Sequence, residues 1–103
     1  MFRQVVMYRW HEGLSTEDLR GFREALERLR AIPELIDMTC GDDVGLFEGN
    51  FDFVVVMDFA EFESARRYVA HPLHQTYVRD YANRVVAERV IVQHEWDGAT
   101  PRP

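Results

Sequence analysis

Residues 52–59, Asp-Phe-Val-Val-Val-Met-Asp-Phe, alternate in the manner of a β-strand and form the most apolar strand that the sequence predicts. One face carries Phe53, Val55, Met57 and Phe59, and the other carries Asp52, Val54, Val56 and Asp58. Because the second face is still half apolar, we expect other parts of the protein to cover both faces of this strand.

The sequence on either side of this strand predicts a split β-α-β pattern. The expected elements are a strand over 2–10, a helix capped by Ser15 and ending near Ile32, strands over 35–41 and 52–59, a helix over 61–70 that restarts after Pro72, and a strand over 86–96. The order β-α-β-β-α-β predicts an α+β, ferredoxin-like fold with a four-stranded antiparallel sheet and helices on one face only.

Helices on one face leave the other face of the sheet without cover. Alternation is expected to place five apolar side chains there, namely Val5, Met7, Val54, Val56 and Ile91. A bare patch of this kind would measure on the order of several hundred Å², which is unusual on a monomer. The sequence therefore predicts a homodimer in which two sheets pack back to back.

The composition fits one domain and narrows the choice of partners. The chain has 103 residues and a net charge of −6, which argues against nucleic acid or a membrane surface as a partner. A single cysteine, Cys40, excludes an internal disulfide and a cysteine-based zinc cluster. We expect no secretory signal before the first strand, and no apolar run in the sequence approaches the roughly 20 residues of a membrane span. We expect a cytoplasmic protein with one domain over 1–96 and a disordered tail over 97–103.

Three local patterns accompany this order of elements. They are Ala31-Ile32-Pro33 at the end of the first helix, Glu48-Gly49-Asn50-Phe51-Asp52 before the third strand, and Tyr68-Val69-Ala70-His71-Pro72-Leu73-His74. Together they resemble the stress-responsive A/B barrel (Dabb) domain family over residues 2–96, and the Y-x-x-H-P-x-H segment is the most specific of the three. The resemblance implies a dimeric α+β barrel in which two ferredoxin-like subunits face each other through their sheets.

The resemblance also implies a candidate active site. A plant polyketide cyclase of this family closes a linear tetraketide by aldol condensation without metal or organic cofactor, in a pocket between sheet and helices. Its catalytic Tyr and His are the first and last residues of the same motif, which correspond to Tyr68 and His74 here. Its further histidines on the first and third strands are replaced by Gln4 and Phe53, so the implied pocket has a different polarity.

The chemistry of Tyr68 and His74 suits such a site. The two residues are six positions apart and would diverge by about 120° on an unbroken helix, but Pro72 interrupts the helix and lets both side chains converge. A neutral imidazole can take a proton from an activated methylene, and a phenol can donate to a carbonyl oxygen that gains negative charge. The alternative is that Tyr68 packs as a core aromatic and His74 only caps the break.

The predicted substrate pocket lies between sheet and helices. Its expected apolar lining is Val6, Tyr8, Phe22, Leu26, Phe53, Val55, Met57, Tyr77, Val90 and Val92. Each of these side chains also fits plain core packing.

Three polar residues are expected at the same pocket, and each of them has an alternative role. Gln4 and His94 are predicted to point towards the helices, where they would bond each other, bond Tyr68 or contact ligand. His71 contacts substrate or makes a structural hydrogen bond to a backbone carbonyl at the helix break. His71 and His74 have metal-like spacing but no third ligand, so we expect no metal.

These observations favour a homodimeric, cofactor-independent enzyme that acts on a hydrophobic carbonyl compound by aldol or proton-transfer chemistry. His74 would be the base and Tyr68 the hydrogen-bond donor. Two alternatives stay open: a non-catalytic stress-responsive dimer that binds an apolar small molecule, and a cofactor-free oxygenase, which rests on fold analogy alone.

Overall fold

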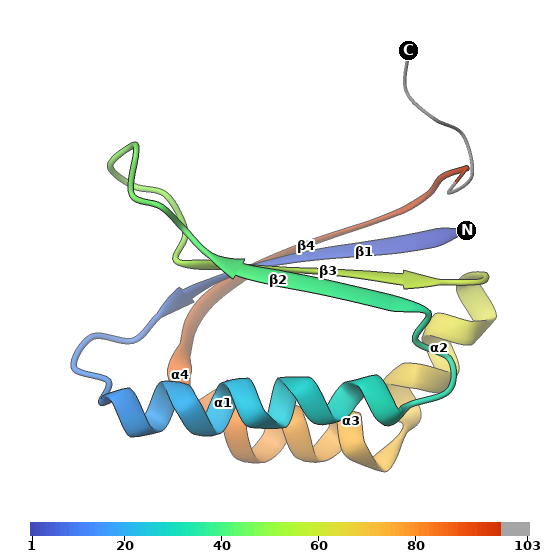
Figure 1. Cartoon of the computed structure of the whole chain (residues 1–103), viewed down its shortest axis with the longest axis horizontal. Helices are drawn as coiled ribbons and strands as arrows, with labels where there is room; N and C mark the ends of the chain where they lie inside the picture. The colour runs from blue at the N-terminus through green and yellow to red at the C-terminus, as the bar shows by residue number, and fades with distance from the viewer. Residues whose placement is uncertain (98–103) are drawn as a thin grey trace.

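A four-stranded antiparallel sheet carries the helices on one of its faces, as predicted (Figure 1). The computed structural model describes residues 1–97, and the strand order is β2-β3-β1-β4. The elements are β1 Phe2–Trp10, α1 Thr16–Arg28, the 3₁₀ turn η1 Leu29–Ala31, β2 Asp37–Asp42, β3 Phe53–Phe59, α2 Phe62–Ala70, α3 Pro72–Thr76, the π-helix η2 Tyr77–Ala82, α4 Asn83–Val85 and β4 Val86–Glu95. This confirms the ferredoxin-like α+β fold. Of the predicted disordered tail, 97–103, all but Asp97 lies outside the described residues.

The first helix begins and ends where its sequence predicts. Ser15 accepts a hydrogen bond from the Asp18 backbone N–H, and the Asp18 carboxylate accepts one from the Ser15 backbone N–H. This reciprocal cap satisfies two donors that a helix start otherwise leaves unpaired. After η1 the chain becomes extended at Ile32, before Pro33, because a residue that precedes proline is disfavoured in the helical region. Within 1–97, none of the helices is long and apolar enough to cross a membrane.

The second helical segment is broken at Pro72, as predicted. His71 has an extended backbone with φ −67° and ψ 139°, and Pro72 then starts α3 at its first position. Proline fits that position because its missing N–H would be unpaired there in any case. Beyond α3, the helix widens into the π-helix η2, a rare form that occurs frequently at functional sites.

The faces of β4 are the reverse of the prediction. Val90 pairs with Met7 and Val92 pairs with Val5, so both valines lie on the open face of the sheet. Ile91 pairs with Val6 and therefore faces the helices. Alternation defines two faces of a strand but does not say which one is inward. Val90 and Val92 would suit a dimer interface as well as a core, so the alternating pattern of β4 alone did not show which face is inward.

The open face of the sheet carries a compact apolar patch. Cross-strand pairing aligns Val54, Met7 and Val90 in one row and Val56, Val5 and Val92 in the next, and we call these six residues the outer apolar patch. Met7, Val90 and Val92 are 39%, 44% and 60% exposed in the single chain. The next row turns polar, since Arg3 makes a 2.8 Å ion pair with Asp58 and has His94 as its other neighbour.

Candidate functional site

Tyr68 and His74 lie against each other at the break between α2 and α3. The centres of their rings are 4.8 Å apart, with an angle of 57° between the ring planes. Tyr68 is only 1% exposed, and its ring also packs against Phe59 with centres 5.0 Å apart. The predicted convergence of the two side chains is therefore present, and the change of direction at His71 and Pro72 produces it.

The hydrogen bond of His74 fixes which ring nitrogen carries the proton. Nδ1 of His74 lies 3.1 Å from the backbone carbonyl oxygen of Val69. A carbonyl can only accept, so Nδ1–H donates, and Nε2 of the neutral ring is left with a free lone pair. Burial lowers the pKa of His74 and the nearby charge of Arg89 lowers it further, against an opposing effect of the Val69 hydrogen bond. His74 is therefore neutral at pH 7, in the form that accepts a proton.

Two further tyrosines extend this cluster towards β1. The hydroxyl oxygens of Tyr8 and Tyr77 are 2.8 Å apart, and the Tyr77 ring centre lies 6.2 Å from that of His74. Burial raises the pKa of Tyr68, Tyr77 and Tyr8 above the usual value. All three phenols thus keep their protons at neutral pH, and one O–H of the Tyr8–Tyr77 pair is used in their mutual hydrogen bond.

The apolar residues predicted to line a cavity instead fill the centre of the domain. Val6, Phe22, Leu26, Phe53, Val55 and Met57 are all buried members of one core cluster. The Phe22 ring packs 5.9 Å from Phe53, 5.7 Å from Tyr8 and 5.5 Å from Tyr77, measured between ring centres. The cavity expected around Phe22 and Val55 is therefore occupied by aromatic side chains, which corrects that prediction.

The polar residues predicted at the pocket have other partners. Gln93 donates a 2.7 Å hydrogen bond to the side-chain oxygen of Gln4 on the helix side of the sheet, so Gln4 is not paired with His94. His94 lies on the open face with Val90 and Val92, and the register removes all three from the predicted pocket. His71 accepts a hydrogen bond from the Leu73 backbone N–H at 3.1 Å, which makes it the N-cap of α3. The expected partner of His71 was a carbonyl, but the helix start offers a free donor instead.

A pocket of about 290 Å³ lies beside this cluster on the helix side of the sheet. It is lined by Tyr8, Ala82, Asn83, Val86, Ala87, Glu88 and Arg89. Arg89 pairs with Tyr8 across the two strands, so its side chain leaves the sheet on the helix face. The sequence analysis did not include Arg89, because it placed the Arg89 side of β4 on the open face of the sheet. Only the pairing of Arg89 with Tyr8 shows that its side chain lies on the helix face.

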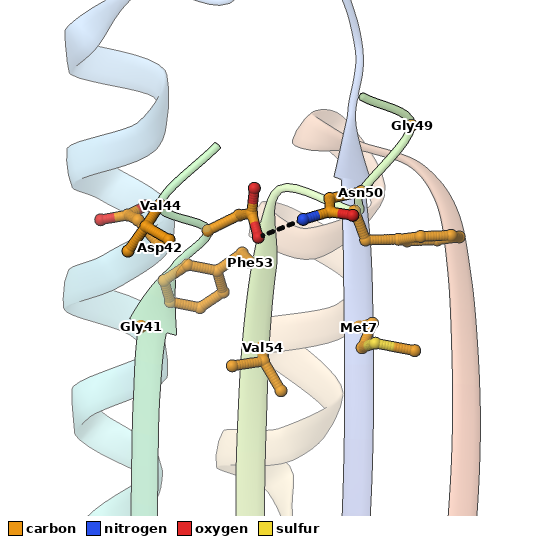
Figure 2. Close-up of a pocket in the computed structure, with 10 residues that line it drawn as sticks. Met7, Gly41, Asp42, Val44, Gly49, Asn50, Phe53 and Val54 are labelled. Atoms are coloured by element: carbon orange, nitrogen blue, oxygen red, sulfur yellow. Dashed lines mark hydrogen bonds between the residues drawn. The ribbon is translucent and has the colours of Figure 1, made fainter. Parts of the chain in front are cut away.

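A larger hollow of about 600 Å³ lies on the open side of the sheet, and neither Tyr68 nor His74 lines it. Figure 2 shows it between the strand ends and the β2–β3 loop, with Met7 and Val54 on its floor and Asn50 donating a 3.1 Å hydrogen bond to Asp43. Its lining continues the outer apolar patch. We therefore assign this hollow to the open face of the sheet and not to the cluster around His74.

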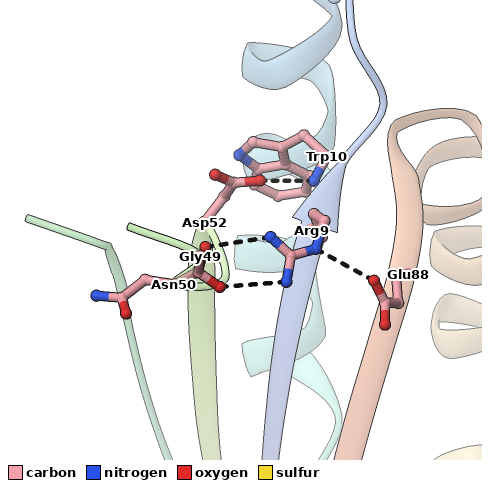
Figure 3. Close-up of polar contacts among 6 residues, drawn as sticks. All are labelled: Arg9, Trp10, Gly49, Asn50, Asp52 and Glu88. Atoms are coloured by element: carbon pink, nitrogen blue, oxygen red, sulfur yellow. Dashed lines mark hydrogen bonds and ion pairs between the residues drawn. The ribbon is translucent and has the colours of Figure 1, made fainter. Parts of the chain in front are cut away.

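The β2–β3 loop rises from the open side of the sheet and is tied to it by Arg9 (Figures 1 and 3). The Arg9 guanidinium donates to the backbone oxygens of Gly49 and Asn50 and to the Glu88 carboxylate, at 3.1 to 3.4 Å. The Trp10 backbone N–H donates to the Asp52 carboxylate at 2.8 Å. Gly49 has a φ of +83°, a conformation that favours glycine. These contacts hold the loop beside the open face, with its apolar tip residues Val44, Leu46 and Phe47 exposed.

Comparison with solved structures supports the fold. A dimeric ferredoxin-like protein of unknown function from Thermobifida fusca YX is 33% identical, with a TM-score of 0.83 over 92% of this chain and 90% of that one. A Dabb family protein from Mesorhizobium loti is 24% identical, with a TM-score of 0.78 over 94% and 97% of the two chains. The hydroxynitrile lyase of Passiflora edulis is 16% identical, with a TM-score of 0.83 over 97% and 96%, and at that identity it shows the fold alone.

The sequence itself also identifies a family. No curated protein matches the chain. The family profile described as the stress responsive A/B barrel domain matches residues 2–95, nearly all of the part that the structure describes. The chain belongs to the stress-responsive A/B barrel (Dabb) domain family.

Proposed function

We propose that this protein is a homodimeric, cytoplasmic, cofactor-independent enzyme that acts on hydrophobic carbonyl compounds, with His74 as the general base and Tyr68 as the hydrogen-bond donor. The observation that carries the proposal is the 3.1 Å contact between Nδ1 of His74 and the Val69 carbonyl, on a ring whose centre lies 4.8 Å from that of Tyr68. In the neutral ring this contact leaves Nε2 as the nitrogen that accepts a proton. A base and a donor on neighbouring rings are the two groups that enolate formation needs.

The chemistry follows from these two groups. Nε2 of His74 takes a proton from the carbon beside a carbonyl, the C–H electron pair forms the enolate, and the Tyr68 hydroxyl donates a hydrogen bond to the enolate oxygen. In an aldol cyclisation the enolate carbon then attacks a second carbonyl of the same molecule, and the imidazolium returns its proton to the new alkoxide. A phenol with a raised pKa stabilises the enolate as a donor without losing its own proton.

The dimer follows from the outer apolar patch. Its six residues form two complete rows over β3, β1 and β4; three of them are exposed in the single chain and the other three are half-buried. A second copy of the same patch is the partner whose pattern matches it about a two-fold axis. The dimeric protein from Thermobifida fusca, at 33% identity, supports this assembly.

Deuterium exchange tests the proposed chemistry without knowledge of the natural substrate. The probe is 4-phenylbutan-2-one in heavy water at pH 7, and NMR measures the loss of protons beside its carbonyl. We expect the wild-type protein to accelerate this loss, and His74→Ala to reduce the acceleration by about 10²-fold. His11→Ala is the matched control, since His11 is an exposed residue outside the cluster.

The outcomes of this assay separate the candidate functions. Equal acceleration by His74→Ala and wild type would remove His74 from the mechanism. Saturable binding of the ketone without any acceleration would favour the alternative, a non-catalytic protein that binds an apolar small molecule.

A further inference from the structure

We propose that Arg89 and Tyr8 form an anion-binding site on the helix face of β4, which takes the carboxylate of a keto acid substrate. This inference rests on the proposed function, since it names the substrate class for the same site. It assigns Arg89 the recognition of a charged end of the substrate, while His74 and Tyr68 act on a carbonyl elsewhere in the molecule.

The first observation is that the Arg89 side chain has no partner in the part of the chain that the structure describes. Among residues 1–97, each of the other arginines contacts a carboxylate or an aromatic ring. The Arg89 side chain makes no hydrogen bond or ion pair within that part of the chain, although the protein carries an excess of carboxylates and a net charge of −6. The neighbouring Glu88 also borders the pocket that Arg89 lines, but its carboxylate pairs with Arg9 at 3.1 Å on the open side of the sheet. An arginine with free donors is the side chain best suited to bind a carboxylate by two parallel hydrogen bonds.

The second observation is the place of Arg89 in the fold. It lines the pocket of about 290 Å³ together with Tyr8, Asn83 and the residues around the start of β4. This pocket lies on the helix side of the sheet, opposite to the outer apolar patch, so a dimer formed through that patch leaves it open. A pocket of this size accommodates one end of a small organic acid.

The third observation connects the pocket to His74. Tyr8 borders the pocket and shares a 2.8 Å hydrogen bond with Tyr77, whose ring packs against that of His74. The charge of Arg89 reaches this cluster, because it lowers the pKa of His74, Tyr8 and Tyr77. We therefore expect a carboxylate bound at Arg89 to direct the rest of a short chain towards the tyrosine pair and His74.

Binding of sodium hexanoate tests this site directly. We expect hexanoate to bind saturably and to shift the NMR signal of the Arg89 Nε–H group, whereas 1-hexanol at equal concentration produces no such shift. Arg89→Gln should weaken hexanoate binding by about tenfold or more, and Arg89→Lys, which keeps the charge, should weaken it less. The matched control is Arg66→Gln, because Arg66 is an exposed arginine of α2 that pairs with the exposed Glu63 and lies outside the pocket.

A second readout separates binding at this site from a general structural effect. Removing the positive charge in Arg89→Gln should raise the pKa of His74, measured from the pH dependence of its ring proton signals, while Arg66→Gln leaves it unchanged. Equal binding of hexanoate and hexanol, unchanged affinity in Arg89→Gln or absence of saturable binding would each overturn the proposal. The hexanoate measurements need no turnover. The Arg89 site can therefore be refuted while the exchange assay supports the proposed function, and the proposed function can be refuted while hexanoate still binds at Arg89.

Discussion

His74 is neutral for reasons that are visible in its contacts. Its ring is half-buried beside Tyr68 and Tyr77, which disfavours the charged form, and its Nδ1–H is committed to the Val69 carbonyl. The sequence predicted the meeting of Tyr68 and His74 because the proline break can be identified from residue type alone. It could not predict the partner of Nδ1, since a backbone carbonyl leaves no mark on the side-chain pattern, or the inward direction of Arg89, which depends on strand register.

We expect both exchange activity and the free energy of unfolding to fall at low pH, because both depend on the neutral form of His74. Burial lowers the pKa of His74 below its usual 6.5, so we expect the midpoint of the loss of exchange activity to lie below pH 6.5, where the ring takes up a proton. The unfolded chain binds that proton at higher pH than the folded one, so the free energy of unfolding should also decline as pH drops from 6.5 through the folded pKa. A pH profile of exchange beside urea unfolding checks both. An activity midpoint above 6.5 would contradict the account.

At the scale of elements, the break between α2 and α3 positions the site. An unbroken helix would direct Tyr68 and His74 about 120° apart, whereas the extended backbone at His71 brings their rings into contact. The sequence indicated this break correctly, and it also predicted the cap and end of α1. It assigned β4 to the wrong faces, because Val90 and Val92 look like core residues until the open side of the sheet is recognised as a second apolar surface.

The role of His71 as a cap leads to a stability prediction. His71→Ala removes the acceptor of the Leu73 N–H, and we expect it to lower the free energy of unfolding by about 1 kcal/mol. His71→Asn should recover most of this loss, since asparagine is among the best N-cap residues. Urea unfolding of the three proteins measures the differences. Equal stability of His71→Ala and wild type would show that the cap contributes nothing.

The two sides of the whole molecule differ. The helices cover one face of the sheet and the β2–β3 loop rises on the other (Figure 1). The cluster around His74 and the pocket at Arg89 lie on the helix side, and the outer apolar patch lies on the open side. The order of elements in the sequence predicted both the uncovered side and its apolar residues on β1 and β3. In the proposed dimer, two copies would associate through the open side and leave the helix side free for the proposed substrate.

The dimer can be broken at a single position of the outer apolar patch. Light scattering on the wild type should give twice the 12.1 kDa of one chain. Val54→Asp introduces a charge opposite the partner's patch, and we expect it to shift the protein towards monomer because a buried, unpaired carboxylate is costly. Ile36→Asp serves as the control, since Ile36 is exposed just before β2 and outside the patch. A wild-type mass of one chain would refute the dimer.

The central claim is that Tyr68 and His74 act on a carbonyl group, and the kinetics of Tyr68→Phe test it most directly. This change removes one oxygen from a buried ring and little volume, so fold and substrate affinity should be preserved. The hydrogen bond to the enolate forms mainly in the transition state, so we predict that kcat for exchange of 4-phenylbutan-2-one falls by about tenfold or more while KM stays unchanged. An unchanged kcat, or a change confined to KM, would contradict the account.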